Sequence, residues 1–117
     1  MKTKTVLTIR ELAVDAKIGF YPEEKAGKQK LVMNVSFEVA EPKKDDVSGT
    51  VNYAELAGEI YEKVRSSEFN LLETLGRFVM DIIMKRPLVK SAEVEIIKPD
   101  APLPHTKGSS VKVTAER

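Results

Sequence analysis

Four side chains in this sequence are of types that transfer protons in enzymes. They are two carboxylates, Glu24 and Glu73, a phenol, Tyr53, and an amine, Lys98. Together these groups would suit acid–base chemistry on a polar heterocycle, and a carboxylate near the start of a helix could also accept two N–H bonds from an amidine-like edge. Their spacing does not prove that they converge, and the more common explanation of Tyr53 is an ordinary half-buried tyrosine that opens a helix.

The other three residues also have ordinary structural explanations. Glu24 follows Glu23 in a loop, where both carboxylates are expected to be solvated. Glu73 lies three residues after Asn70, which is the spacing of a helix capping box. Lys98 falls in phase with the buried face of a strand, so its side chain either reaches out of the core to solvent or points into a pocket.

The composition narrows the classes of protein to consider. The chain has 117 residues, of which 42% are hydrophobic and 32% charged, and this predicts a soluble protein with a single domain at residues 1–117. A net charge of +1 and few aromatic residues give no reason to expect a nucleic-acid partner. No segment has the length of a membrane span or the apolar stretch of a signal peptide, so we expect no membrane partner and a cytoplasmic protein.

Metal and thiol chemistry are disfavoured by the same sequence. It has no cysteine, which excludes disulfides, thiolate metal sites and thiol catalysis. Its one histidine, His105, cannot supply the two or three His or Cys ligands of a usual catalytic zinc site. We therefore expect no metal and no cofactor, and an exposed loop position for His105.

Hydrophobic periodicity predicts six regular elements. Apolar residues alternate in two N-terminal segments, and the alternation slips at Arg10–Glu11, which favours a β-bulge there. Helical spacing follows, with Asn52 and Asn70 as the caps of two helices. The predicted elements are strands at 7–18 and 31–39, helices at 53–64 and 72–83, and strands at 93–98 and 111–115.

This order of elements predicts an α+β fold in which two helices cover one face of a four-stranded antiparallel sheet. Such a sheet has two edges that invite pairing with other chains. Closing several copies of the chain into a ring would remove both edges. We therefore expect a homo-oligomer, although the sequence does not indicate the number of subunits.

Four segments resemble the dihydroneopterin aldolase family of folate biosynthesis, in the same order and at matching separations. They are IGFYPEEKAGKQKLVMNV from Ile18, GTVNYAEL from Gly49, NLLETLGRFV from Asn70 and VEIIKPDAPLP from Val94. The resemblance implies the tunnelling fold (T-fold), with the order ββααββ, in which four subunits close their sheets into a barrel and two such rings commonly stack into an octamer. It also implies a pterin pocket between neighbouring subunits.

The resemblance implies a role for each candidate residue. Glu73 would anchor the pterin through its 2-amino and N3 hydrogens, helped by backbone groups such as that of Leu72. Lys98 resembles the catalytic lysine, and Glu24, rather than the glutamate before it, resembles the loop glutamate near that lysine and the substrate side chain. Tyr53 resembles a tyrosine that comes from the adjacent subunit and takes part in the proton transfers after bond cleavage.

The reaction implied is a metal-independent retro-aldol cleavage, which makes the family carbon–carbon lyases. The substrate, 7,8-dihydroneopterin, loses the proton of its 2′-hydroxyl, and its conjugated C6=N5 imine accepts the electrons, so neither a metal nor a lysine Schiff base is needed. Glycolaldehyde leaves, and protonation of the enol gives 6-hydroxymethyl-7,8-dihydropterin. Lys98 would act in proton transfer and in electrostatic stabilisation near N5.

Two other functions stay open at this point. An epimerase acting at the 2′ carbon of dihydroneopterin or its triphosphate would use the same residues, and Lys25, Lys28 and Lys30 could form the basic cluster that a triphosphate favours. A non-catalytic, ring-forming domain that binds a pterin would also fit the fold. Where the family often has a glycine beside a valine in the last strand, this chain has Ser109 and Ser110, which leaves the pocket contour there open.

Overall fold

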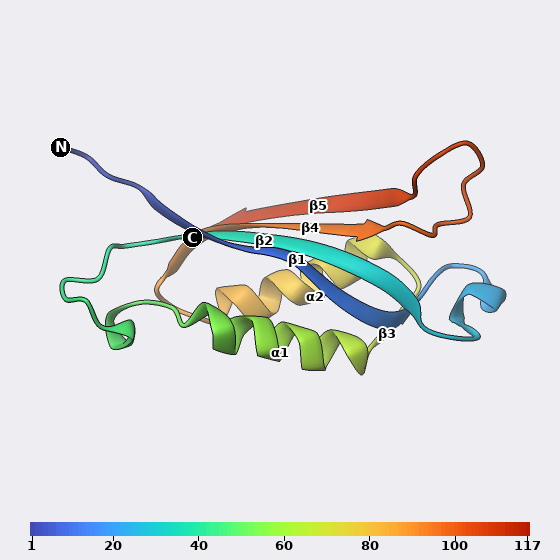
Figure 1. Cartoon of the computed structure of the whole chain (residues 1–117), viewed down its shortest axis with the longest axis horizontal. Helices are drawn as coiled ribbons and strands as arrows, with labels where there is room; N and C mark the ends of the chain where they lie inside the picture. Colours follow the sequence, from blue (N-terminus) through green and yellow to red (C-terminus); the bar gives the residue numbers. More distant parts are fainter.

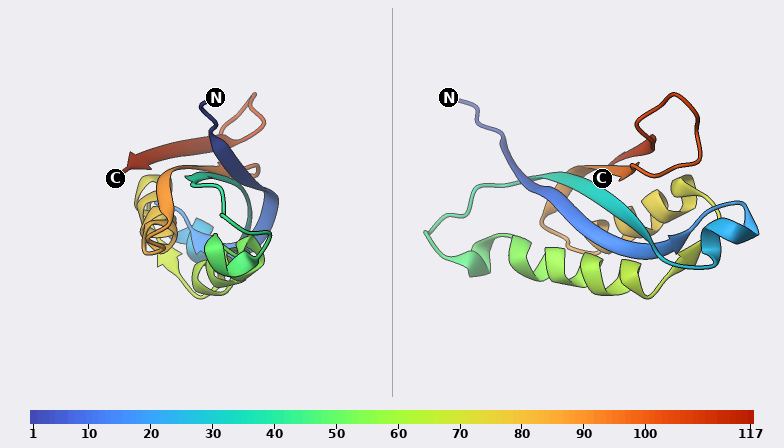
Figure 2. Two further views of the ribbon diagram at one scale, coloured as in Figure 1. Left: turned by 90° about the vertical axis from the view of Figure 1, so that its left-hand side faces the viewer. Right: turned by 45° about the vertical axis from the view of Figure 1, so that its right-hand side comes forward.

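Two α-helices lie against one face of a curved β-sheet (Figures 1 and 2). The computed structural model describes residues 1–117. The strands are β1 (Thr5–Ile18), β2 (Gln29–Val39), β3 (Glu68–Phe69), β4 (Val89–Lys98) and β5 (Ser109–Glu116). The helices are α1 (Tyr53–Arg65) and α2 (Leu72–Met84), with short 3-10 turns η1 (Pro22–Lys25) and η2 (Val47–Gly49).

The sheet has the strand order β3-β1-β2-β4-β5. The four long strands pair antiparallel, and both helices cover the same face, as the sequence predicts. The prediction of only four strands is wrong, because β3 adds a fifth that runs parallel to β1. A strand of two residues is too short to produce an alternation pattern, so its pairing becomes visible only in the folded chain.

The predicted β-bulge at Arg10–Glu11 is confirmed. The register of β1 against β2 shifts between Ile9 and Leu12. Glu11 has a positive φ of 51°, and its N–H, which the ladder leaves unpaired, donates to the side-chain oxygen of Asn34 at 2.9 Å. The bulge therefore explains why the buried face of β1 changes phase along the strand.

The hydrophobic core lies between the sheet and the two helices. The face of β2 that the sequence predicts to be apolar is buried in full: Leu31, Met33, Val35, Phe37 and Val39. Each fully buried side chain of this size contributes about 1.5–3 kcal/mol to stability. Helix α2 approaches β5 closely at Gly76, where a Cβ would lie 2.7 Å from a methyl carbon of Val113. A side chain at Gly76 would push the helix away from the sheet.

The two helices begin in different ways. Asn52 caps α1 as predicted, because its side-chain oxygen accepts the N–H groups of Ala54 at 3.0 Å and Glu55 at 3.2 Å. The prediction that Asn70 caps α2 is wrong: the cap position is taken by Leu71, which has no side-chain oxygen. The Asn70 side-chain oxygen instead accepts a hydrogen bond from the Lys25 ammonium.

The topology brings distant parts of the chain to one end of an elongated molecule. The loop after β1, the end of β4 and the start of α2 all lie at the right-hand end of Figure 1, whereas α1 starts at the left-hand end. The second view in Figure 2 shows the same arrangement. Residues at the right-hand end are therefore the ones that can act together within one chain.

Neither helix is long and apolar enough to cross a membrane.

Candidate active site

Lys98 is the only polar residue among the 24 buried residues of the chain, with 7% of its surface exposed. It is the last residue of β4 and is paired with Ser109 of β5. Alternation along β4 puts it on the same face as Val94 and Ile96, which are fully buried. A charged amine at such a position requires a partner, because an unpaired buried charge is costly.

The partner of Lys98 is Glu24. The lysine ammonium donates to Oε2 of Glu24, and the two side chains are only 9% and 10% exposed. In each of the other six ion pairs of the chain both side chains are at least 24% exposed. The structure therefore contains one shielded ion pair, and it joins the loop after β1 to the end of β4.

The environment of Glu24 keeps its carboxyl group ionised. The hydrogen bond from Lys98 is the largest influence and lowers the pKa of Glu24 below the ordinary value of 4.5. Burial opposes this effect, whereas a hydrogen bond from the Tyr21 N–H to Oε1, at 3.2 Å, adds to it. At neutral pH the pair consists of a carboxylate acceptor and an ammonium donor held side by side.

Two residues that the sequence analysis did not single out hold Glu24 in place. Gly19 lies directly under the glutamate, so a Cβ at Gly19 would come within 2.3 Å of Cβ of Glu24. The side-chain amide of Gln29 donates to the backbone oxygens of Ile18 at 2.8 Å and Glu24 at 3.0 Å. The local sequence pattern around Gln29 does not indicate this role, because the path of the loop decides whether the two backbone oxygens come within reach of its side chain.

Glu23, the neighbouring carboxylate, does not take part in the pair. It is exposed and lines a hollow of about 290 Å³ together with Lys28 and Asp100. Of the two loop glutamates, only Glu24 is aimed at Lys98.

Glu73 and Leu72 lie at the same end of the molecule, in the first turn of α2. Because Asn70 does not cap the helix, Glu73 is its second residue and forms no capping box. Its carboxylate is exposed. The first N–H groups of any helix lack partners within the helix. The start of α2 thus offers a carboxylate acceptor beside free N–H donors.

Tyr53 lies apart from the other candidates in the single chain. It is the first residue of α1, at the opposite end of the molecule from Lys98, and is 60% exposed. The 13 residues of α1 alone span about 20 Å. Tyr53 lines a hollow of about 450 Å³ with apolar neighbours that include Leu7 and Val47. The structure therefore groups three of the candidate residues, with Leu72, and leaves the fourth distant.

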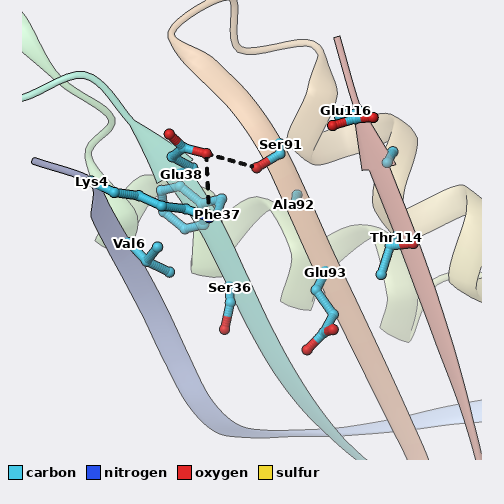
Figure 3. Close-up of a pocket in the computed structure, with 11 residues that line it drawn as sticks. Lys4, Val6, Ser36, Phe37, Glu38, Ser91, Ala92, Glu93, Thr114 and Glu116 are labelled. Carbon is cyan, nitrogen blue, oxygen red and sulfur yellow. Dashed lines mark hydrogen bonds and ion pairs between the residues drawn. The ribbon is translucent and has the colours of Figure 1, made fainter. Parts of the chain in front are cut away.

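A hollow of about 660 Å³, larger than those at Glu24 and Tyr53, is not at this site. Figure 3 shows it over the helix-free face of the sheet, where it crosses β1, β2, β4 and β5. Its charged lining residues are Lys4, Glu38, Glu93 and Glu116. None of these is buried, and no group of His, Cys, Asp or Glu in the chain is arranged to hold a metal ion. Size alone therefore does not identify the functional site.

The family model and the related sequences that match this chain agree on one protein family. The family model described as dihydroneopterin aldolase matches residues 7–116. A dihydroneopterin aldolase from Haemophilus influenzae is 36% identical over 98 residues, covering 80% of this chain and 81% of that protein. A dihydroneopterin triphosphate 2′-epimerase from Pseudomonas aeruginosa is 30% identical over 100 residues, covering 81% of this chain and 80% of that protein.

Solved structures share the fold over nearly the whole chain. A crystal structure of a Vibrio cholerae protein assigned as a dihydroneopterin aldolase superposes with a TM-score of 0.87 at 30% identity, covering 99% of this chain and all of that one. The Escherichia coli dihydroneopterin aldolase in complex with neopterin superposes with a TM-score of 0.83 at 24% identity, covering 95% of this chain and 98% of that one. At that identity the second likeness concerns the fold alone.

Proposed function

The chain belongs to the dihydroneopterin aldolase family, and from this membership we propose that it cleaves 7,8-dihydroneopterin by a retro-aldol reaction. The bond between C1′ and C2′ of the trihydroxypropyl side chain breaks, glycolaldehyde leaves, and protonation at C1′ gives 6-hydroxymethyl-7,8-dihydropterin. The observation that carries the proposal is the shielded Glu24–Lys98 pair at the same end of the molecule as Glu73.

Glu73 is the proposed anchor for the pterin ring. The 2-amino group and N3 of a pterin present two parallel N–H donors, and a carboxylate accepts such a pair in charge-assisted hydrogen bonds. The carboxylate of Glu73 is exposed and is not engaged in a capping box. Backbone groups at the start of α2, such as that of Leu72, would complete the recognition of the ring edge.

The Glu24–Lys98 pair is the proposed catalytic group. When the C1′–C2′ bond breaks, the 2′-hydroxyl loses its proton and the electron pair moves into the C6=N5 imine. An ammonium that is largely shielded from solvent and oriented by a carboxylate stabilises the charge that develops at N5. Glu24 is ionised at neutral pH, and Lys98 lowers its pKa further, so its carboxylate can accept hydrogen bonds from the side-chain hydroxyls of the substrate. In the proposed sequence the Glu24 carboxylate takes up the proton of the 2′-hydroxyl, the Lys98 ammonium gives a proton to C1′, and transfer of the proton from Glu24 to Lys98 restores the pair, so no metal and no cofactor enter the proposed reaction.

Tyr53 would complete the site from a neighbouring subunit. Its exposed position at the opposite end of the chain supports this assignment. So do the two edges of the sheet, because β5 and most of β1 each have one side without a partner strand. Pairing these edges between copies would form a ring. We propose a ring of four subunits, and an octamer where two rings stack, with each site shared between two chains.

The test is incubation with 7,8-dihydroneopterin in the presence of a metal chelator, followed by chromatography of the products. Equal amounts of 6-hydroxymethyl-7,8-dihydropterin and glycolaldehyde are expected. Binding of the pterin without any turnover would instead establish a non-catalytic pterin-binding domain, and no consumption and no binding would refute the proposed function. The same chromatogram separates the 2′-epimer, so it measures any epimerase activity directly.

The charges near the pair favour an unphosphorylated substrate over a triphosphate. The hollow beside Glu24 has two further carboxylates, Glu23 and Asp100, and a single cation, Lys28. Lys25 donates a hydrogen bond to the side chain of Asn70, just before α2. Lys30 of β2 is paired with Asp15 of β1 in the sheet. The basic cluster that a triphosphate would need is therefore not assembled in the single chain. We expect kcat/KM to be higher for dihydroneopterin than for its triphosphate, and the reverse order would favour the epimerase.

A further inference from the structure

The loop that carries Glu24 is fastened to the segment in front of α2 at several points. Residues 17 and 18 of β1 form the short parallel ladder with β3. The N–H of Gly19 donates to the backbone oxygen of Phe69 at 3.1 Å. The ammonium of Lys25 donates to the side-chain oxygen of Asn70. These contacts connect the base and the tip of the loop to three consecutive residues, 68–70, that lead directly into the helix.

The use of Asn70 in this contact is informative. Asparagine is among the best residues for capping a helix, and Asn70 lies close to the start of α2. Its side-chain oxygen is nevertheless directed to the loop, and the cap position falls to Leu71, which has no side-chain oxygen to offer. The local stability of α2 therefore does not explain where this side chain lies.

The turn η1 is held from two sides by adjacent residues. Glu24 is paired with Lys98 at the end of β4, and Lys25, the next residue, is paired with Asn70 before α2. Both contacts leave from one 3-10 turn of four residues. The position of the turn is thus defined relative to both elements that carry the other candidate residues.

We propose that Lys25 and Asn70 form a positioning brace, which sets the Glu24–Lys98 pair at a fixed separation from Glu73. This inference rests on the proposed function, in which Glu73 holds the pterin ring and the pair acts on its side chain. Asn70 is three residues before Glu73, so a contact to Asn70 fixes the loop close to the ring anchor. A displacement of a catalytic group by about 1 Å can lower a rate by about a hundredfold.

The brace predicts a specific kinetic signature. Lys25→Met keeps the length of the side chain and removes the ammonium, and Asn70→Ala removes the acceptor without removing a helix cap. Each is expected to lower kcat about tenfold, with KM and the affinity for neopterin changed less than about twofold, because the ring anchor is untouched. The double variant should lose no more than either single one, since both remove the same contact.

Two further variants make the test selective. Asn70→Asp keeps an oxygen that accepts from Lys25 and should keep a near-normal kcat. Lys17→Met removes an exposed ammonium beside the same loop but leaves the backbone ladder with β3 intact, so it should leave kcat and KM at their wild-type values. Equal kcat losses in Asn70→Asp and Asn70→Ala, or additive losses in the double variant, would overturn the brace.

Hydrogen exchange gives a readout that does not depend on turnover. In Lys25→Met, amides of residues 19–28 should exchange faster than in wild type, including the N–H of Glu24, which is bonded to Tyr21 at 3.0 Å. Lys17→Met should show wild-type exchange there. If wild-type protein forms no product, the proposed function fails, and the brace is then decided by exchange alone. Unchanged exchange in Lys25→Met would refute it.

Discussion

Replacing Lys98 with methionine would show how much the shielded ion pair contributes to stability. Methionine keeps an unbranched side chain at a buried position and removes the ammonium. Glu24 would retain the Tyr21 N–H as a donor but lose the contact that most lowers its pKa, while its side chain stays about nine-tenths buried. Leaving a charged group unpaired in such a position costs about 1–3 kcal/mol. For a chain of 117 residues this corresponds to a Tm lower by about 4 °C per kcal/mol.

The control is the double variant Glu24→Gln/Lys98→Met, in which both charges are gone. Because no buried carboxylate is left without its partner, the double variant should recover most of the stability that Lys98→Met loses. Unfolding by denaturant, followed at one fixed subunit concentration, measures the free energy of each variant, since association would otherwise shift the apparent stability. Lys98→Met should also lose most turnover while keeping its oligomeric state.

The pH dependence supplies a second check with a definite sign. The folded-state pKa of Glu24 lies below the ordinary value of 4.5, so the pair stabilises the protein above that pH and loses its effect as the pH falls through the folded value. The stability gap between wild type and Lys98→Met should therefore be widest near neutral pH and narrow below about pH 4.5. A gap that is absent at neutral pH, or a double variant no more stable than Lys98→Met, would refute the reasoning.

Three further predictions follow from single contacts. Glu73→Gln should weaken neopterin binding by about 10- to 100-fold in an equilibrium titration, with Tm unchanged, because a charge-assisted hydrogen bond is lost; an unchanged affinity would contradict its role as anchor. Gly19→Ala should lower turnover and destabilise the fold by about 1–3 kcal/mol, because the new methyl would lie 2.3 Å from Cβ of Glu24, whereas Gly27→Ala, with nothing within 4 Å, is the matched control and should behave as wild type in both assays. Arg117→Met should cost about 1–2 kcal/mol in denaturant unfolding, since the guanidinium donates to three backbone oxygens at 2.6–2.8 Å, and wild-type stability would show that these bonds exchange freely with water.

Local patterns predicted much of the secondary structure because they reflect local physics. The alternation of β2 and the helical spacing of α1 describe which face of each element is buried, and burial follows from that periodicity alone. The bulge at Arg10–Glu11 was readable for the same reason, since one extra residue shifts the phase of every side chain after it. The phase of Lys98 within β4 placed it on the buried face but left open whether its amine reaches solvent, and the structure shows that it is buried.

Contacts between remote residues were beyond these patterns. The spacing of Asn70 to Glu73 is typical of a helix cap, but the folded chain brings Lys25 to Asn70 from 45 residues away. The ladder between β1 and β3 was missed because only tertiary proximity makes two residues a strand. Gln29 gave no signal because its amide bonds to backbone atoms of a loop whose course the sequence does not state.

The sequence by itself determined the order and type of the main elements, the buried faces and the short set of residues able to transfer protons, because each depends on side-chain type and spacing over a few neighbours. Side-chain type and spacing did not separate Glu24 from Glu23, and only the family resemblance favoured Glu24. The tertiary structure shows that Glu24 meets Lys98, 74 residues away, and that Tyr53 lies at the far end of the same chain. The physical reason is that a contact between remote residues depends on the path of the whole backbone, which is set by the packing of the sheet against both helices at once.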